Sequence, residues 1–310
     1  MRAEIFVLNY NGHDLLPECL PSILEAAQRS PVPCPVTVID NESTDDSLDI
    51  LRRDFPGARI LPLKNRVLCS FNDAVRASNA DIVLLLNNDL KADPDFVAPL
   101  LRVFEEHPDA LMAGPKTYTF DGRQYEGSLA KLYFRYGLPG CQTRFPGYET
   151  QVDRPALTAE SGFGAFRRDY FLELGGYDDL YLPGTIEDLD LCYRGWKVGY
   201  ACYYEPQSRM NHKGQATFKK SFGRTRILAI NQRNLYLFIW KNITDRKFLL
   251  DHLLWFFVRP LWFLAQGRAE FLVGFLWSFG RLPQALSRRA RQKKVLTKRT
   301  DREIFKLLGV

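Results

Sequence analysis

The stretch Ile82-Val83-Leu84-Leu85-Leu86-Asn87-Asn88-Asp89-Leu90 decides the fold of this chain. Five apolar residues run together and end at two amides and a carboxylate. Such a short, continuous apolar run predicts a strand that is buried on both faces of a parallel sheet. Ligands of such sheets bind beyond the carboxyl ends of the strands, so Asn87 and Asp89 should face a ligand. The structural alternative is a loop that caps the next helix, but Asp93 and Pro94 are expected to supply that N-cap and first helical position.

Three further strands are expected before this run, and each is followed by a helix. The expected strands cover residues 4–8, 36–39 and 60–63, and the expected helices cover residues 15–24, 43–51 and 72–77. The second of these helices should open with a capping box from Ser43 to Asp46. Strands that alternate with helices predict an α/β domain whose central, mostly parallel sheet is flanked by helices.

Each expected strand ends in a polar cluster. The clusters are Asn9 with Asn11, Asp40 with Asn41, Lys64 with Asn65, and Asn87 with Asp89. Because parallel strands end at one edge of a sheet, these clusters should line one pocket. No GxGxxG follows the first strand and no GxxxxGK[ST] occurs, which excludes a dinucleotide fingerprint and a phosphate-binding loop. A divalent cation on Asp89 would instead neutralise phosphates, since Mg²⁺ takes one or two carboxylates plus phosphate oxygens.

A second acidic stretch, Thr185-Ile186-Glu187-Asp188-Leu189-Asp190, opens a helix that is expected to stop at Gly199. Acidic residues are common in a first helical turn because they face the positive end of the helix, which explains one or two of the three carboxylates. The same positive end should keep Asp188 ionised, as a general base near neutral pH must be.

Two shorter features add to the site. The small residues 161–165 let the backbone approach a ligand, although a tight turn before a helix explains them nearly as well. A strand is expected over residues 200–204, with His212 in a later loop. A lone histidine is usually structural, but together with Asp89 it becomes a candidate metal ligand.

Six stretches of the sequence, taken in order, resemble motifs of glycosyltransferase family 2, especially those of its bacterial rhamnosyltransferase-like members, which have the GT-A fold. Each stretch is weak alone, and the ordered set is specific. The stretches lie within residues 4 to about 215 and are Val7-Leu8-Asn9-Tyr10-Asn11-Gly12, Asp40-Asn41-Glu42-Ser43-Thr44-Asp45, Leu86-Asn87-Asn88-Asp89, Gly175-Gly176-Tyr177-Asp178, Glu187-Asp188-Leu189-Asp190-Leu191-Cys192 and His212-Lys213-Gly214.

The resemblance implies a role for each site residue. Asp89 and His212 would bind a divalent metal, Mg²⁺ or Mn²⁺, and Asp188 would be the catalytic base of an inverting displacement. The acceptor side would be formed by Gly162, Glu187 and Asp190. The donor-binding residues would be Asn9, Asn11, Asp40, Asn41, Asn65, Asn72, Asn87 and Asn88.

The sequence departs from the family pattern in two places. Asn87 replaces the first carboxylate of the DxD motif, so only one carboxylate reaches the metal from this loop. The segment Arg66-Val67-Leu68-Cys69-Ser70-Phe71-Asn72 stands where relatives often carry glycines. Its Arg66 could reach a phosphate.

The C-terminal part differs in composition. The net charge is +6, yet from Arg246 onward there are 14 lysines and arginines against 4 acidic residues, so the rest of the chain is acidic. Apolar runs rich in Leu, Phe and Trp are interrupted by charges and never reach the ~18 residues of a spanning helix. Such segments indicate an amphipathic helical region at a membrane interface, and a helical cap on the catalytic domain is the alternative. A basic cluster at residues 288–299 would strengthen contact with an anionic leaflet.

The expected organisation is a GT-A catalytic domain over residues 1–217, with a nucleotide-sugar half to about 116 and an acceptor half over 117–217, followed by a helical, basic region over 218–310. The expected function is transfer of a sugar from a dTDP- or UDP-sugar, with dTDP-rhamnose among the candidates, to a glycan on a polyprenyl-diphosphate lipid in cell-surface polysaccharide synthesis. The expected location is peripheral, at the cytoplasmic face of the bacterial inner membrane. Six scattered cysteines without a CxxC pair agree with a reducing compartment.

Two alternatives remain. A sugar-1-phosphate nucleotidyltransferase also has an α/β nucleotide-binding domain, but it needs a glycine-rich, basic loop after the first strand, which Asn9-Tyr10-Asn11-Gly12 does not supply. A nucleic-acid-binding protein could use the basic C-terminal region, but that region has no recognised nucleic-acid module. No nucleic-acid partner is therefore expected.

Overall fold

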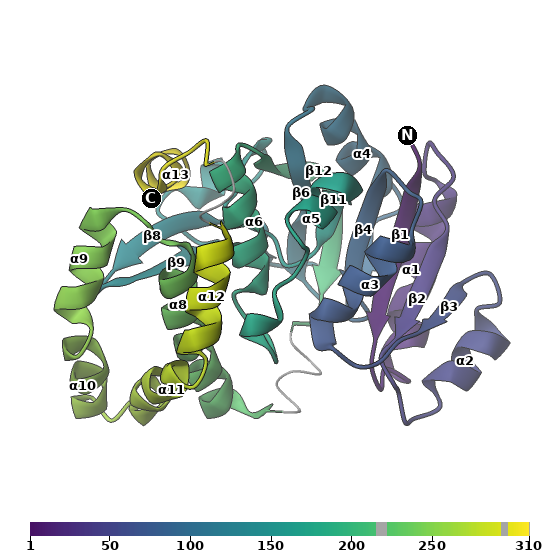
Figure 1. The fold of residues 1–310 in the computed structure, drawn as a ribbon. Helices are drawn as coiled ribbons and strands as arrows, with labels where there is room; N and C mark the ends of the chain where they lie inside the picture. Colours follow the sequence, from purple (N-terminus) through teal and green to yellow (C-terminus); the bar gives the residue numbers. More distant parts are fainter. Residues whose placement is uncertain (215–221, 293–296, 310) are drawn as a thin grey trace.

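The computed structural model of the chain describes residues 1–214, 222–292 and 297–309. The N-terminal half consists of β1 (Ala3–Asn9), α1 (Leu15–Gln28), β2 (Val36–Asp40), α2 (Ser47–Asp54), β3 (Arg59–Pro62), α3 (Ser70–Ala77) and β4 (Ile82–Asn87). The four strands are parallel neighbours in the order β4-β1-β2-β3. This half of the fold follows the alternation of strands and helices in the sequence, and it occupies the right of Figure 1.

Most strands of the second half extend the same sheet, and one antiparallel pair, residues 131–135 with 138–142, forms a sheet of its own. Its elements are β5 (Leu90–Ala92), α4 (Val97–Glu106), β6 (Ala110–Thr119), β7 (Tyr125–Gly127), β8 (Lys131–Arg135), β9 (Leu138–Gln142), β10 (Ala156–Leu157), β11 (Gly164–Arg167), α5 (Arg168–Glu173), α6 (Glu187–Val198) and β12 (Ala201–His212). β11 lies antiparallel between β4 and β6, and β12 runs parallel to β6, so the complete sheet is mixed. The α/β fold class is confirmed, and helices cover both faces of this sheet.

Strand alternation builds a core on each face of the sheet. Val7, Val38 and Leu84 belong to one apolar cluster, which includes residues of α1 and α4. Phe6 and Val83 point to the other face and pack with α3 and α6. Because both faces are covered, the strands have few polar residues until they end, and the polar residues gather at the strand ends.

The C-terminal region is helical, as its composition predicts. It contains α8 (Arg224–Asn242), α9 (Arg246–Trp255), α10 (Val258–Ala265), α11 (Ala269–Phe279), α12 (Leu282–Gln292) and α13 (Asp301–Leu308). Figure 1 shows these helices beside α6, β8 and β9, far from β3 and α2. Phe238 of α8 and Ile304 of α13 share the apolar cluster of Val83, so these helices pack on the α/β body. The predicted boundary between residues 217 and 218 lies outside the described residues.

Three local predictions are wrong. Ser43 caps no helix, because α2 begins at Ser47 and the Ser43 hydroxyl accepts from Asn9 Nδ2 and the Asn11 backbone N–H. Asp93 is not an N-cap, because β5 and a turn closed by Phe96 N–H to the Asp93 carbonyl delay α4 until Val97. His212 does not lie in a loop, since β12 continues to it by pairing with β6 and β5.

Candidate functional site

The carboxyl ends of the parallel strands meet at one edge of the sheet. Asn9 lies opposite Asp40, and Leu8 lies opposite Asn87, which is partly exposed. The buried Asn9 amide donates to Asp40 Oδ1 at 3.5 Å, and its Oδ1 accepts from Asn88 Nδ2 at 2.7 Å. The structure therefore brings these four predicted donor-binding residues together.

Gly12 closes the back of this cluster. A Cβ at Gly12 would lie 2.2 Å from both Asn9 Oδ1 and Asn88 Nδ2. Any larger residue would break the bond between the two amides, so the glycine of the first motif has a steric role and not a phosphate-binding one.

The loops after β1, β2 and β3 are held by their own amides. Asn11 Oδ1 accepts from the Thr44 backbone N–H at 2.7 Å, and Asn65 Oδ1 accepts from the Val67 N–H at 3.0 Å. Asn41 Nδ2 donates to the Val67 carbonyl at 3.2 Å, while its buried Oδ1 has no partner among the described residues. A buried acceptor without a donor is costly, so Asn41 Oδ1 is suited to a ligand N–H or O–H.

Asn72 is placed differently from the other donor-binding candidates. Its Nδ2 donates to the Tyr177 carbonyl at 2.8 Å, and its Oδ1 accepts from the Tyr177 N–H at 2.9 Å. A Cβ at Gly176 would lie 2.3 Å from Asn72 Oδ1. Asn72 therefore holds the Gly175–Tyr177 turn with one donated and one accepted hydrogen bond.

Asp89 and His212 meet because β5 pairs with the end of β12, which sets His212 opposite Leu90. His212 Nε2 lies 3.6 Å from Asp89 Oδ2, and its Nδ1 lies 3.0 Å from Glu126 Oε2 on β7. Burial disfavours the charged imidazole, but hydrogen bonds and charges from Asp89 and Glu126 outweigh it and raise the pKa of His212 to about 9.

These residues fit a divalent cation whose other ligands come from a diphosphate. The buried Oδ1 of Asp89 has no partner among the described residues, and a metal-binding histidine usually donates its other ring N–H to a carboxylate, as Glu126 allows here. The described part of the chain contains no group of three or more His, Cys, Asp or Glu placed to hold a metal. Asp89 and His212 would therefore need phosphate oxygens to complete the coordination.

The first turn of α6 presents Glu187 and Asp188. Glu187 Oε2 and Asp188 Oδ1 are buried and have no partner among the described residues. Burial, helped by the charges of Glu187 and Glu160, raises the pKa of Asp188 well above its usual range, and burial raises the pKa of Glu187 to about 7. Burial and the neighbouring carboxylates therefore oppose the ionisation of Asp188 that the start of the helix was expected to favour.

A cavity of about 600 Å³ opens beside Asp188. Ile186 and Leu189 line it from the α6 side, and Ile227 and Leu228 line it from α8. The polar lining is provided by Cys141, Glu160, Thr185, Asp188, Arg224 and Asn231. The cavity can therefore take a molecule that is partly apolar and that brings a hydroxyl to a carboxylate.

Gly162 and Phe163 connect the two carboxylate sites. A Cβ at Gly162 would lie 3.6 Å from Asp188 Oδ2, and the next ring, Phe163, has its centroid 5.3 Å from that of His212. The candidate base and the candidate metal ligand thus flank one dipeptide, as a transfer between neighbouring donor and acceptor sites requires.

Asp190 lies away from this cavity in a polar network. Lys241 Nζ and Arg194 Nε each approach Asp190 Oδ2 at 2.8 Å, and Tyr181 and Asn242 donate to its Oδ1 at 2.7 Å. Burial opposes its ionisation, but Lys241 and Arg194 hold the pKa of Asp190 below its usual range. With both oxygens engaged, Asp190 holds α6 against α8, and we assign it this role in place of the acceptor role expected from the sequence.

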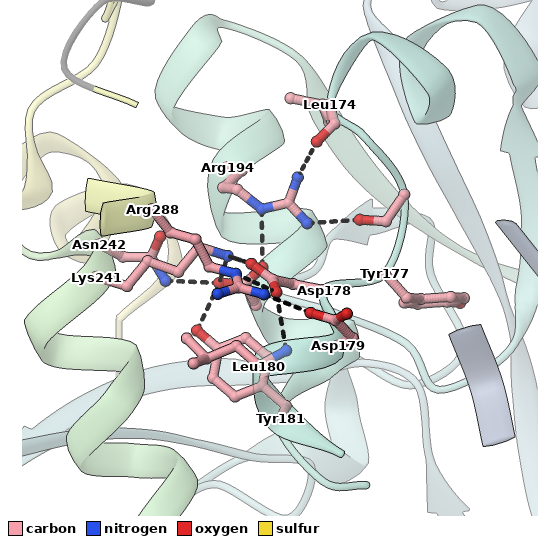
Figure 2. A network of polar contacts seen from close by, with 12 residues as sticks. Leu174, Tyr177, Asp178, Asp179, Leu180, Tyr181, Arg194, Lys241, Asn242 and Arg288 are labelled. Atoms are coloured by element: carbon pink, nitrogen blue, oxygen red, sulfur yellow. Dashed lines mark hydrogen bonds and ion pairs between the residues drawn. The ribbon is translucent and has the colours of Figure 1, made fainter. Parts of the chain in front are cut away.

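The network reaches the C-terminal helices (Figure 2). Lys241 Nζ of α8 also lies 2.6 Å from Asp178 Oδ2, and Arg288 Nε of α12 lies 2.7 Å from Asp178 Oδ1. Arg288 pairs with Asp179 as well, and Arg289 donates to the Trp240 carbonyl at 3.0 Å. Part of the basic cluster predicted to face lipid is therefore used to bind α12 to the body, while its Lys293 and Lys294 lie outside the described residues.

Three side chains of the site were not predicted from the sequence. Glu126 is brought to His212 by the β6–β7 hairpin, which the sequence does not reveal. Glu160 precedes the small-residue segment without a motif of its own. Lys241 could have been found from the sequence, because it directly follows the apolar run Leu235–Trp240, and a lysine that is buried with such a run needs an acidic partner.

Comparison with known proteins identifies the family. Residues 4–175, more than half of the chain, match the family model described as glycosyl transferase family 2. A glucosyl-dolichyl phosphate glucuronosyltransferase of Haloferax volcanii is 26% identical over 229 residues, which cover 69% of this chain and 69% of that protein. An N-acetylgalactosaminyltransferase 7 of Drosophila melanogaster is 22% identical over 83% of this chain, which spans 46% of that protein.

Solved structures share the fold. S. aureus TarS 1-349 aligns with a TM-score of 0.54 and 15% identity over 96% of this chain and 83% of that one. The mannosyltransferase PcManGT of Pyrobaculum calidifontis, solved with GDP-Man and Mn²⁺, has a TM-score of 0.52 and 15% identity over 94% of this chain and 87% of that one. GalNAc-T7 with UDP, GalNAc and Mn²⁺ has a TM-score of 0.60 and 16% identity over 79% of this chain, which spans 48% of that one. From its sequence and its fold, this chain belongs to glycosyltransferase family 2.

Proposed function

We propose that the protein transfers a sugar, with inversion, from a nucleotide-diphospho-sugar to a hydroxyl of a lipid-linked glycan. The observation that carries this proposal is the placement of Asp188 and His212 on the two sides of Gly162–Phe163. A donor held at the strand ends and an acceptor in the cavity beside Asp188 would then meet across this dipeptide.

The residues divide the chemistry between them. Asn9, Asp40 and Asn41 would hold the nucleoside, and Asp89 with His212 would hold a divalent metal that neutralises the diphosphate. Asp188 takes the proton of the acceptor hydroxyl while the oxygen of that hydroxyl bonds to the anomeric carbon. The bond from that carbon to the diphosphate oxygen breaks in line, and the nucleoside diphosphate leaves. No enzyme nucleophile is needed, so the anomeric configuration inverts.

A metal-dependent donor site has support outside this chain. PcManGT and GalNAc-T7, which share the fold, were both crystallised with Mn²⁺ and nucleotide ligands. In this chain, Asp89 Oδ1, which has no partner among the described residues, and His212, which contacts Glu126, would be two ligands for such a metal.

The acceptor class rests on the cavity and on a relative. The cavity combines Ile186, Leu189, Ile227 and Leu228 with a single arginine, Arg224, which suits an apolar chain that carries a phosphate. The Haloferax relative is named for a dolichyl phosphate-linked substrate. We therefore propose a polyprenyl-phosphate or polyprenyl-diphosphate lipid as the carrier of the acceptor glycan.

Peripheral binding at the cytoplasmic face of a bacterial inner membrane completes the proposal. Many large apolar side chains are exposed on α9, α10 and α11 and on the turn between α9 and α10, among them Leu250, Leu253, Leu254, Phe257, Leu261, Trp262, Leu276 and Trp277. No single described helix is long and apolar enough to span a membrane, although α9 and α10, bent by 42°, meet that test as a pair. An exposed patch of this kind supports contact with lipid.

A panel of nucleotide-sugars tests the proposed function. Thermal unfolding is followed with UDP-, dTDP- and GDP-sugars, with and without Mn²⁺ or Mg²⁺, and the donors that bind are then incubated with polyprenyl-phosphate-linked glycans. A donor at a hundred times its Kd should add about 2.7 kcal/mol to the free energy of unfolding. Transfer to a lipid-linked acceptor, with inversion of the anomeric configuration, is expected. Donor binding of equal strength with and without Mn²⁺ or Mg²⁺ would contradict the metal site.

A further inference from the structure

The turn that presents the candidate base has an unusual backbone. Thr185 has φ = 71° and Ile186 has φ = 73°, although both residues are β-branched. Such residues rarely adopt positive φ, and a turn of this kind persists only when its surroundings hold it. Helix α6 begins at the next residue, Glu187, and its first backbone bond runs from the Asp190 N–H to the Ile186 carbonyl at 2.8 Å. The direction in which Asp188 points therefore depends on this turn.

One amide from α8 holds the turn. Asn234 is fully buried, and its Nδ2 lies 2.8 Å from the Tyr181 carbonyl, 2.8 Å from the Gly184 carbonyl and 2.9 Å from the Thr185 carbonyl. An amide group has two hydrogens, so these three acceptors share them. All the donor capacity of Asn234 is directed at the segment that precedes the base.

Arg233 adds a second point of attachment. Its Nη2 donates to the Leu182 carbonyl at 2.7 Å, and its Nε donates to Asn234 Oδ1 at 3.0 Å, which fixes the orientation of the amide. The donor side of Asn234 must then face the turn, and a flipped amide would place oxygen against carbonyl oxygens.

The same stripe of α8 lines the cavity beside Asp188. Ile227, Asn231 and Asn234 are spaced by four and three residues, so they lie on one face of the helix. Ile227 and Asn231 line the cavity, while Asn234 holds the turn. One helical face thus forms a wall of the proposed acceptor site and sets the geometry of the proposed base.

We propose that Asn234, oriented by Arg233, is a positioning residue that holds the Thr185–Ile186 turn and thereby directs Asp188 at the acceptor. The inference rests on the proposed function for its catalytic consequence, but the hold on the turn is a property of the fold alone. The C-terminal region is then part of the catalytic apparatus, in addition to any role at a membrane.

Steady-state kinetics of the full chain separates positioning from general stability. Asn234→Ala should lower kcat for transfer by about 10²-fold, the scale of a misplaced catalytic group, and should leave the donor KM within about twofold. Gln232→Ala is the matched control, because Gln232 is a buried amide on the same helix whose Oε1 accepts from Arg259 and contacts no part of the turn among its described bonds. It should lose stability without a comparable loss of kcat.

Relief of the backbone strain gives the sharpest test. Glycine adopts positive φ freely, so Thr185→Gly introduced into Asn234→Ala should raise kcat by about tenfold or more over that of Asn234→Ala, with Thr185→Gly alone measured as the reference for the pair. Should Asn234→Ala not yield folded protein, Asn234→Ser, which keeps one donor, takes its place in the series. Equal kcat losses in Asn234→Ala and Gln232→Ala, or no recovery with glycine, would overturn the inference.

Hydrogen exchange distinguishes this inference from the proposed function. Amides of residues 184–190 should exchange faster in Asn234→Ala than in the wild type, with no change in the strands β1 to β4. If the wild-type protein transfers no sugar but this local change occurs, the proposed function fails and the hold on the turn stands. If exchange in residues 184–190 is unaltered, the positioning role is wrong whatever the activity.

Discussion

His212 Nε2 lies 3.6 Å from Asp89 Oδ2, so one metal ion could bind both atoms. In the protein without metal, this space is spanned by an ion pair, since Asp89 and Glu126 raise the pKa of His212 to about 9 against its burial. A cation must therefore displace a proton from the imidazole before both residues can bind it.

Metal affinity should consequently rise with pH. Below a pH of about 9 the imidazole is protonated, so binding releases one proton and affinity should rise about tenfold per pH unit from 6.5 towards 9, then level off. Mn²⁺ titrations by calorimetry, with nucleoside diphosphate present, measure the slope. His212→Gln should bind Mn²⁺ more weakly and with a flatter pH dependence, and Asp89→Ala should abolish metal-dependent donor binding. An equally steep slope in His212→Gln would assign the released proton to another group.

The sequence predicts the residues at the strand ends of this site better than the partner that reaches His212. The positions of Asn9, Asp40, Asn87 and Asp89 follow from the rule that parallel strands end at one edge, which depends only on local patterns. Glu126 reaches His212 through strand pairings that no local pattern encodes.

The charge state of Asp188 and the role of Asp190 could not be predicted for a related reason. Both residues are in the first turn of α6. Asp188 has a raised pKa and an Oδ1 without a partner among the described residues, whereas Asp190 is neutralised by Lys241 and Arg194. The difference comes from the packing of α8 against α6, which brings together residues that are far apart in the sequence. Desolvation and these charged partners outweigh the effect of the helix dipole, which is the only one of the three that can be predicted from the local sequence.

Lys241 should be essential for stability. It is 2% exposed and lies between Asp178 and Asp190, so Lys241→Met removes one of the two cations that face each of these carboxylates and leaves Arg194 and Arg288. Loss of one partner of a buried ion pair typically costs about 3–5 kcal/mol. Urea unfolding measures this loss, and Lys247→Met, at an exposed position of α9, should change the free energy of unfolding by less than about 0.5 kcal/mol. Similar stability of the two variants would mean that the network is not held by Lys241.

The exposed apolar residues at the end of α9 and in the turn that follows it should bind lipid. Leu253, Leu254 and Phe257 are 68%, 74% and 65% exposed, and burial of each in a lipid interface is worth about 1.5–3 kcal/mol. Replacing all three with glutamine should abolish co-sedimentation with vesicles of anionic and neutral lipid, without lowering the melting temperature. Deletion of the C-terminal helices is a poorer test, because Phe238 and Ile304 belong to the core.

The control for this variant tests charge separately. Arg52→Gln with Arg53→Gln alters exposed residues of α2, far from α9, and should leave vesicle binding intact. If the triple glutamine variant binds vesicles normally but no longer self-associates in sedimentation experiments, a second copy of the chain covers this face and the membrane proposal is wrong.

The identity of the base is the most direct test of the chemistry. Asp188 and Glu160 both line the cavity, while Glu187 lies beside Asp188 with an unpartnered Oε2. Asp188→Asn keeps the shape of the side chain but cannot accept the proton of the acceptor hydroxyl. General-base catalysis contributes about 10²–10⁴-fold, so kcat should fall by that factor while the donor Kd changes little.

The pH dependence of transfer should follow the same carboxylates. Burial and the charges of its neighbours raise the pKa of Asp188, so the fraction of ionised base, and with it kcat, should increase as the pH rises. Glu160→Gln removes one of these charges and should shift the rise to lower pH with transfer retained, and Glu187→Gln should do the same. A normal rate in Asp188→Asn together with loss of transfer in Glu187→Gln or Glu160→Gln would move the base to that residue, because its removal alone then stops the proton transfer.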